Sequence, residues 1–329
     1  MSNEILTGLT RDNIHLSRPN SGLGIAVQFN CSNLPNAVAH YVRDSIAENT
    51  RRSYQSDLRH FELWGGSLPA SPETVAAYLA AHADHLSVTT MIRRLASLSK
   101  AHQVRGLSNP IRSELVRATL RGIKRKRRRT QLQAKPLLRD DLLLVLDAMG
   151  NGPKDLRDRA LLLIGFAAAL RRSELVALDV VDVEHVRRGI VLHLKRSKTD
   201  QHGEGHNIAI PYGRGRWCPI ACLDAWLSAS GIIEGAIFRP VDRHARVHNT
   251  RLSGEAVSIL VRERIAAARL DPTGYSGHSL RAGLATSAAQ AGVAAWRIKS
   301  QTRHTSEAML ARYIRQAELF IDNAAGALL

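Results

Sequence analysis

Residues 161–178, LLLIGFAAALRRSELVAL, contain the features that decide the fold of this 329-residue chain. The segment from Leu161 to Leu170 is apolar on every helical face, which is typical of a helix buried at the centre of a domain. Two arginines follow where that helix should end, and a second, short helix is predicted over 173–178. A guanidinium buried at such a point needs an acidic partner or a bound anion. The stretch therefore predicts a helical core with an arginine held at its edge.

The segments that follow this stretch predict one small sheet among further helices. GIVLHLK (189–195) and NIAIP (207–211) alternate apolar and polar residues, and turn-forming residues lie between them, which indicates a β-hairpin. Apolar periodicity predicts helices over 140–149, 155–170, 219–227, 253–267, 279–289, 294–301 and 306–315. The expected fold class is therefore mainly α with a small antiparallel β-sheet.

The residues before 122 predict a separate helical domain. From Pro35 onward, apolar residues recur at intervals of three or four. Ser71-Pro72 is a typical helix start, and Thr89-Thr90 is expected to open a further helix. The sequence thus divides into an N-terminal arm (1–34), a helical domain (35–122), a basic linker (123–136) and a larger domain (137–329).

The expected linker carries six consecutive basic residues: Lys124, Arg125, Lys126, Arg127, Arg128 and Arg129. Like charges in such a run repel one another and resist packing, which predicts an exposed connection. A solvated charge run is the simpler interpretation. Here, however, the run divides two domains of a chain with 46 Lys plus Arg against 29 Asp plus Glu and a formal net charge of +17. Contact with the phosphates of nucleic acid is therefore the favoured hypothesis.

The composition argues against several other classes of protein. No apolar run reaches the roughly 18 residues that span a bilayer, and the first residues lack a signal-peptide pattern. We therefore expect a cytoplasmic, nucleoid-associated protein without a membrane partner. Cys218 and Cys222 have no second pair nearby, HGEGH (202–206) has the pattern of a turn, and there is no phosphate-binding lysine loop or carboxylate cluster. We therefore expect no metal and no other cofactor.

Basic residues followed by a tyrosine remain as candidates for chemistry. In GHSLRAG, His278 and Arg281 are three positions apart at a helix start, which places both side chains on one face beside free N–H groups that favour an anion. Lys198 lies just beyond the first hairpin strand. In RHTSEAMLARYIR, Tyr313 follows His304 by nine positions. Each feature alone has an ordinary structural explanation, such as a capped surface helix, a turn lysine or a packed tyrosine.

Together and in this order, the residues resemble the tyrosine recombinase (phage integrase) family, which includes the Cre- and Xer-like site-specific recombinases. The resemblance covers about residues 35–329 and rests on ALRRSEL, a hairpin lysine, H-x-x-R and a His with Tyr nine positions later. It implies six catalytic residues, the last being the nucleophile: Arg171, Lys198, His278, Arg281, His304 and Tyr313. Arg171 fits the family register better than Arg172, because SEL follows at the usual distance. Thr302-Arg303 stands where Leu-Gly commonly precedes the His, which adds a charge near the phosphate.

The resemblance also implies a function, a domain assignment and partners. Family members cleave and rejoin DNA strands at specific sites through a 3′-phosphotyrosyl intermediate, without metal or ATP. Residues 35–122 would form the DNA-binding core-binding domain, and 137–329 the catalytic domain with a C-terminal exchange helix. The expected partners are double-stranded DNA with specific recombination sites and further copies of the chain, as a homotetramer on two duplexes.

Three other functions agree with part of the pattern. A type IB topoisomerase uses similar chemistry but relaxes DNA without a specific site. A regulatory DNA-binding protein that keeps only the fold would form no covalent complex, and the complete catalytic set argues against it. A basic structural protein of the nucleoid would leave the tyrosine pattern unexplained.

Overall fold

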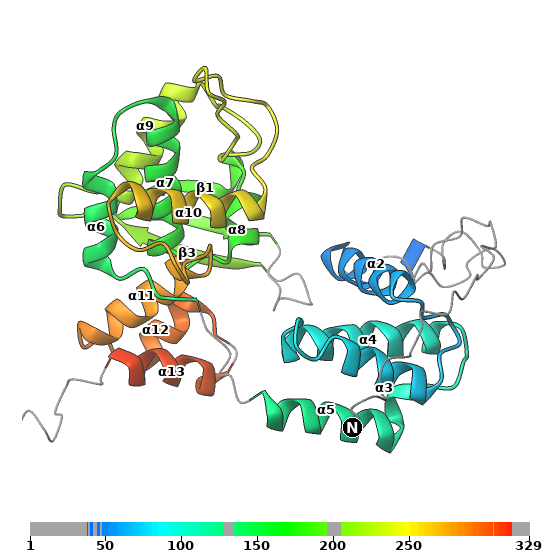
Figure 1. Ribbon diagram of the computed structural model, residues 1–329. Helices are drawn as coiled ribbons and strands as arrows, with labels where there is room; N and C mark the ends of the chain where they lie inside the picture. Colours follow the sequence, from blue (N-terminus) through cyan, green and yellow to red (C-terminus); the bar gives the residue numbers. More distant parts are fainter. Residues whose placement is uncertain are drawn as a thin grey trace, which may run out of the picture. The chain divides into compact units, whose positions relative to one another are not determined.

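The computed structural model describes residues 48–127, 134–195, 205–304 and 306–317, together with residues 38, 40, 41, 45 and 46. The chain divides into two compact units, 1–130 and 131–329, both drawn in Figure 1. The described residues are mainly helical with one small antiparallel sheet, which confirms the predicted fold class. In this part of the chain, no helix combines the length and apolarity needed to cross a bilayer.

The first unit is a set of helices around its own core. Its α-helices are α2 (Glu48–Leu63), α3 (Pro72–Ala81), α4 (Val88–Val104) and α5 (Glu114–Lys126), with a 3-10 turn at Pro110–Arg112. Ser71 caps α3 as predicted, because its hydroxyl accepts a hydrogen bond from the Thr74 backbone N–H. α4 begins slightly earlier than expected, since Ser87 rather than Thr89 supplies its cap.

The basic segment after Ile123 is helical at its start, because α5 continues past residue 122, where the helical domain was expected to end. Lys124, Arg125 and Lys126 form the last turn of α5, with their side chains exposed. Cations are favourable at a helix C-terminus because the unpaired carbonyl groups there carry partial negative charge. Arg127 follows the helix and donates to the carbonyl oxygens of Leu86 and Asp84. Arg128 and Arg129 lie outside the described residues.

The second unit contains a three-stranded antiparallel sheet in the order β1 (Val183–Val186), β2 (Gly189–Leu194) and β3 (His206–Pro211). β2 pairs with β3 in the register that places Ile190 opposite Ile210, which confirms both predicted hairpin strands. β1 was not predicted. Its four residues, VEHV, are mostly exposed, so they show little of the alternation that reveals a strand.

Eight α-helices make up most of the rest of the described part of the second unit. They are α6 (Arg139–Asp147), α7 (Pro153–Ala167), α8 (Arg172–Ala177), α9 (Pro219–Ser230), α10 (Gly254–Ala267), α11 (Ser279–Gln290), α12 (Ala295–Thr302) and α13 (Glu307–Ala317). Each lies within a few residues of a predicted helix. α7 is buried along nearly its whole length, as its apolar sequence predicts, and it packs against α8, α9 and α11. In Figure 1 it runs through the centre of this unit, with α11, α12 and α13 grouped together in orange and red.

Two glycines and one turn position the helices that carry the candidate site. A Cβ on Gly165 of α7 would lie within 3.0 Å of both Leu280 and Leu175, so this glycine lets α7 approach α11 and α8 closely. A Cβ on Gly283 of α11 would lie 1.9 Å from the Leu137 carbonyl oxygen. After α7, Ala169 takes a left-handed backbone conformation (φ 48°), and the chain turns there into α8.

Candidate active site

Tyr313 and His278 meet where α13 packs on α11. The Tyr313 hydroxyl oxygen lies 3.0 Å from His278 Nε2, although the two residues are 35 positions apart. Tyr313 is partly buried against Ala285, Ile298 and Leu310, which join α11, α12 and α13. The His278 backbone N–H donates to the Ser276 hydroxyl at 3.2 Å. The predicted nucleophile and a second predicted catalytic residue, His278, are thus within hydrogen-bonding distance of each other.

Both groups of this pair are neutral at pH 7. Burial raises the pKa of Tyr313 above its ordinary value of 10, and the charges of Arg281 and Arg312 oppose that rise only in part. Burial also lowers the pKa of His278 below 6.5, and the positive charges of Arg281 and Arg171 lower it further. A neutral imidazole with its hydrogen on Nδ1 can accept the phenol hydrogen at Nε2. The pair is therefore suited to moving a proton from Tyr313 to His278.

Arg281 is a fully buried cation with an open donor. Its side chain comes from the first turn of α11, the residue is 1% exposed, and Nη1 donates to the Ala169 carbonyl oxygen at 2.8 Å. Nη2 is buried and has no hydrogen-bond partner among the described residues. Burial, followed by the charges of Arg171 and Arg303, lowers its pKa to about 10, so it stays protonated at pH 7. An unpaired donor on a buried cation indicates a place for an anion.

Arg171 lies at the start of α8 and has an acidic partner, as expected for an arginine at the end of the buried helix. Glu174 Oε1 accepts from Arg171 Nη1 at 2.6 Å, and Oε2 accepts from the Arg171 backbone N–H at 2.9 Å. Oε2 also accepts from Arg303 Nη2 at 2.8 Å. Burial alone would raise the pKa of Glu174, but the charges and hydrogen bonds of the two arginines outweigh it and leave the pKa lowered. Glu174 is therefore a buried carboxylate shared by two guanidinium groups.

Arg172, the alternative to Arg171, makes a different contact. Its Nη1 is 3.5 Å from the Ser258 hydroxyl on α10. Arg171, in contrast, lowers the pKa of Arg281 and of His278 through its charge, so it belongs to the same cluster as they do. Of the two arginines, Arg171 is therefore the one whose charge acts on His278 and Arg281.

His304 follows α12 and packs beside Tyr313, with ring centroids 5.6 Å apart. It is 5% exposed, and its Nδ1 lies 2.7 Å from the Thr302 hydroxyl oxygen. That hydroxyl donates its hydrogen to the Ile298 carbonyl oxygen at 2.7 Å, so it accepts from Nδ1–H. Burial, together with the charges of Arg281, His278 and others, lowers the pKa of His304 to about 4. The imidazole is neutral at pH 7, and its Nε2 is an acceptor.

Comparison with known proteins shows the family to which the chain belongs. Residues 135–319 match the model of the phage integrase family. An integrase/recombinase XerD homologue of Selenomonas ruminantium is 40% identical over 290 residues, which cover 85% of each chain. The chain belongs to the phage integrase family. It is a site-specific recombinase of the tyrosine class.

Two further proteins are similar to this recombinase. Recombinase Cre of Escherichia phage P1 is 27% identical over 311 residues, which cover 87% of this chain and 88% of that one. A crystal structure of a lambda integrase tetramer bound to a Holliday junction superimposes with a TM-score of 0.58. That alignment covers 82% of this chain and 75% of the other at 19% identity, so it shows a shared fold.

The recombinase brings five of the six sequence-predicted catalytic residues into one cluster: Arg171, His278, Arg281, His304 and Tyr313. Lys198 lies outside the described residues. The basic residues of α5 belong to the first unit. Sequence reasoning did not anticipate Glu174 as the acidic partner or Thr302 as the partner of His304. Glu174 could have been found, because it lies three residues after Arg171 at the start of a predicted helix.

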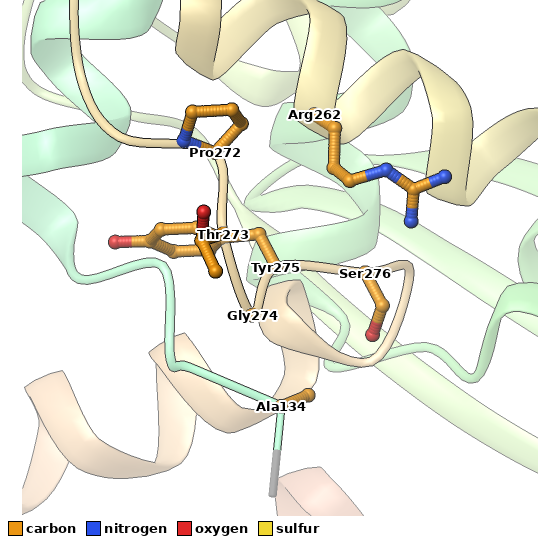
Figure 2. Close-up of a pocket in the computed structure, with 7 residues that line it drawn as sticks. All are labelled: Ala134, Arg262, Pro272, Thr273, Gly274, Tyr275 and Ser276. Carbon is orange, nitrogen blue, oxygen red and sulfur yellow. The ribbon is translucent and has the colours of Figure 1, made fainter. Parts of the chain in front are cut away.

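Tyr275, the other tyrosine near this region, occupies a different environment. It is 4% exposed, packs into the main hydrophobic core of the unit, and has Lys135 Nζ 4.9 Å from its ring centre. Figure 2 shows it at the edge of an open pocket of about 530 Å³ lined by Ala134, Arg262, Pro272, Thr273, Gly274, Tyr275 and Ser276. Tyr313, in contrast, lies within hydrogen-bonding distance of His278 and close to the charge of Arg281. Tyr313 is therefore the better placed nucleophile.

Proposed function

We propose that this recombinase cleaves and rejoins double-stranded DNA at specific sites through a 3′-phosphotyrosyl bond to Tyr313, without metal or ATP. The observation that carries the proposal is the 3.0 Å contact between the Tyr313 hydroxyl and His278 Nε2, beside the buried Arg281 and the exposed face of Arg171. A phosphodiester repels nucleophiles through its own negative charge. Two guanidinium groups can each donate two parallel hydrogen bonds to its non-bridging oxygens and favour the more highly charged transition state.

In the cleavage step, the Tyr313 oxygen forms a bond to phosphorus and the bond from phosphorus to the 5′-oxygen breaks. His278 accepts the phenol proton, which its lowered pKa permits because the ring is neutral. Lys198 is proposed to protonate the departing 5′-oxygen. The energy of the phosphoester is retained, so a 5′-hydroxyl of a second strand can reverse the step and join the new strand.

His304 is proposed to contact a phosphate oxygen in the transition state. Its Nδ1–H is already used on Thr302, which leaves Nε2 as the ring nitrogen available to a phosphate oxygen. Nε2 donates a hydrogen bond only when the ring is protonated. The second negative charge that develops on phosphorus favours that protonation, which makes the contact stronger in the transition state than in the ground state.

The assembly is also a proposal. We expect the exchange helix after residue 317, which lies outside the described residues, to bind a neighbouring subunit in a homotetramer on two duplexes. The similar fold of the lambda integrase tetramer bound to a Holliday junction supports this arrangement. The helical domain 35–122 and the basic residues from Lys124 to Arg129 are proposed to hold the DNA backbone, which agrees with the exposed basic turn at the end of α5 and with an association with the nucleoid.

The test is to trap covalent protein–DNA adducts and sequence their ends. The wild-type chain is incubated with DNA of the element that encodes it, and the reaction is stopped with detergent. The Tyr313→Phe variant keeps the ring and its packing but lacks the attacking oxygen, so it should bind DNA and form no adduct. Tyr275→Phe is the matched control and should form adduct normally.

Two results would contradict the proposal. Adduct formed by the Tyr313→Phe chain would place the nucleophile elsewhere. Adduct ends spread evenly over the DNA, with relaxation of any supercoiled plasmid, would favour a topoisomerase instead.

A further inference from the structure

Arg303 carries a largely buried side chain at a backbone position that normally favours glycine. It follows α12 with a left-handed conformation (φ 55°), and its side chain is 9% exposed. Nη2 donates to Glu174, whereas Nε and Nη1 are buried and have no hydrogen-bond partner among the described residues. Both the conformation and the unpaired donors are costly. Such a combination persists only where the surroundings require it, which points to a role in the site.

The contact with Glu174 determines how that carboxylate holds Arg171. A carboxylate alone with an arginine typically accepts two parallel hydrogen bonds from the guanidinium. Here Oε2 is occupied by Arg303 Nη2 and by the Arg171 backbone, so the Arg171 guanidinium is held at Nη1 through Oε1 alone. The other donors of that guanidinium stay available to a ligand, and the Arg171 side chain is 21% exposed.

Arg303 also changes the charge of the cluster. Counted by formal charge among the described residues, the three guanidinium groups of Arg171, Arg281 and Arg303 contribute +3 and the Glu174 carboxylate contributes −1. The net charge is therefore +2, and it would be +1 without Arg303. A phosphodiester carries one negative charge, and the pentacoordinate transition state carries nearly two. The additional charge therefore stabilises the transition state more than the bound ground state.

We propose that Arg303 is a positioning residue. It prevents Glu174 from accepting two hydrogen bonds from the Arg171 guanidinium, and it supplies the second net positive charge of the phosphate site. This inference rests on the proposed function, because it concerns the same reaction. DNA binding draws on many phosphates, so loss of Arg303 should affect the cleavage rate and leave binding nearly unchanged.

The test compares Arg303→Gly with the wild-type chain in single-turnover formation of the covalent adduct at a mapped site. Glycine suits the left-handed backbone, so the substitution removes the guanidinium without adding strain. We expect the cleavage rate to fall about tenfold to a hundredfold, with DNA affinity within about twofold of wild type. Arg303→Lys, which keeps the charge but offers a single point donor, should recover part of the rate. Arg297→Gln removes an exposed arginine of α12 that stacks on Trp296 and should cleave at the wild-type rate.

A substrate with a neutral methylphosphonate at the scissile position separates this role from a purely structural one. If Arg303 acts on the developing charge, the defect of Arg303→Gly should shrink at least severalfold on the neutral substrate. An equal defect on both substrates, or full activity of Arg303→Gly, would overturn the inference. A wild-type chain that forms no adduct would instead contradict the proposed function itself, and this inference with it.

Discussion

Acidification should destabilise this recombinase through His304. The imidazole is buried, and burial together with nearby positive charges lowers its pKa from 6.5 to about 4. In the unfolded chain the same group takes up a proton near pH 6.5, whereas in the folded chain it does so only near pH 4. Between these values the unfolded state binds more protons, so the free energy of unfolding falls as the pH falls. The stabilising contribution is complete above about pH 7 and is lost progressively as the pH falls to about 4.

The size of the effect follows from the two pKa values. One pKa unit corresponds to about 1.4 kcal/mol, so the complete loss on acidification amounts to about 3 kcal/mol. The part expressed between pH 7 and pH 5 is about 2 kcal/mol. His278 contributes in the same direction, because burial lowers its pKa as well. A variant that removes only the His304 titration is therefore needed to isolate the effect.

His304→Asn serves this purpose, because asparagine can donate to the Thr302 hydroxyl oxygen from the position of Nδ1 and does not titrate. Urea unfolding of both chains, followed by tryptophan fluorescence at pH 7 and pH 5, gives the two free energies. We expect the wild type to lose about 2 kcal/mol more than His304→Asn over this interval. Equal losses in the two chains would refute the reasoning, since they would mean that His304 is not held neutral by its surroundings.

Three other perturbations follow from the structure. Gly283→Ala should cost about 1–3 kcal/mol in urea unfolding, because its Cβ would lie 1.9 Å from a backbone carbonyl oxygen, whereas Gly122→Ala in α5, with no atom within 4 Å, should cost nothing. Glutamine at both Lys124 and Lys126 should weaken binding to all DNA sequences alike and reduce the slope of log affinity against log salt concentration by about 0.9 per lost phosphate contact. An unchanged slope would show that these lysines are solvated and do not contact phosphates. Deletion of residues 318–329 should leave single-site binding in gel-shift assays but abolish strand exchange, and normal exchange by the truncated chain would contradict the tetramer proposal.

The local sequence determined most of the secondary structure and pointed to the candidate reacting groups. The apolar run of α7 could form only a buried helix, and Ser71-Pro72 carries the hydroxyl and the fixed φ that start α3. ALRRSEL, the hairpin lysine, H-x-x-R and the His with Tyr nine positions later together indicated the family. Local sequence patterns did not predict the short exposed strand β1 or the helical conformation of the basic residues at the end of α5. In both places the local preference for one conformation is weak.

Only the tertiary structure decided how these groups act on one another. Arg303 reaches Glu174 across 129 positions of sequence, and Tyr313 reaches His278 across 35. The lowered pKa of His304 and the open donors of Arg281 and Arg303 arise from burial by several elements at once. The physical reason is that hydrogen-bond propensities and periodicity act over a few residues along the chain. Electrostatic coupling and desolvation depend instead on distance in space and on what displaces water, and packing alone sets both.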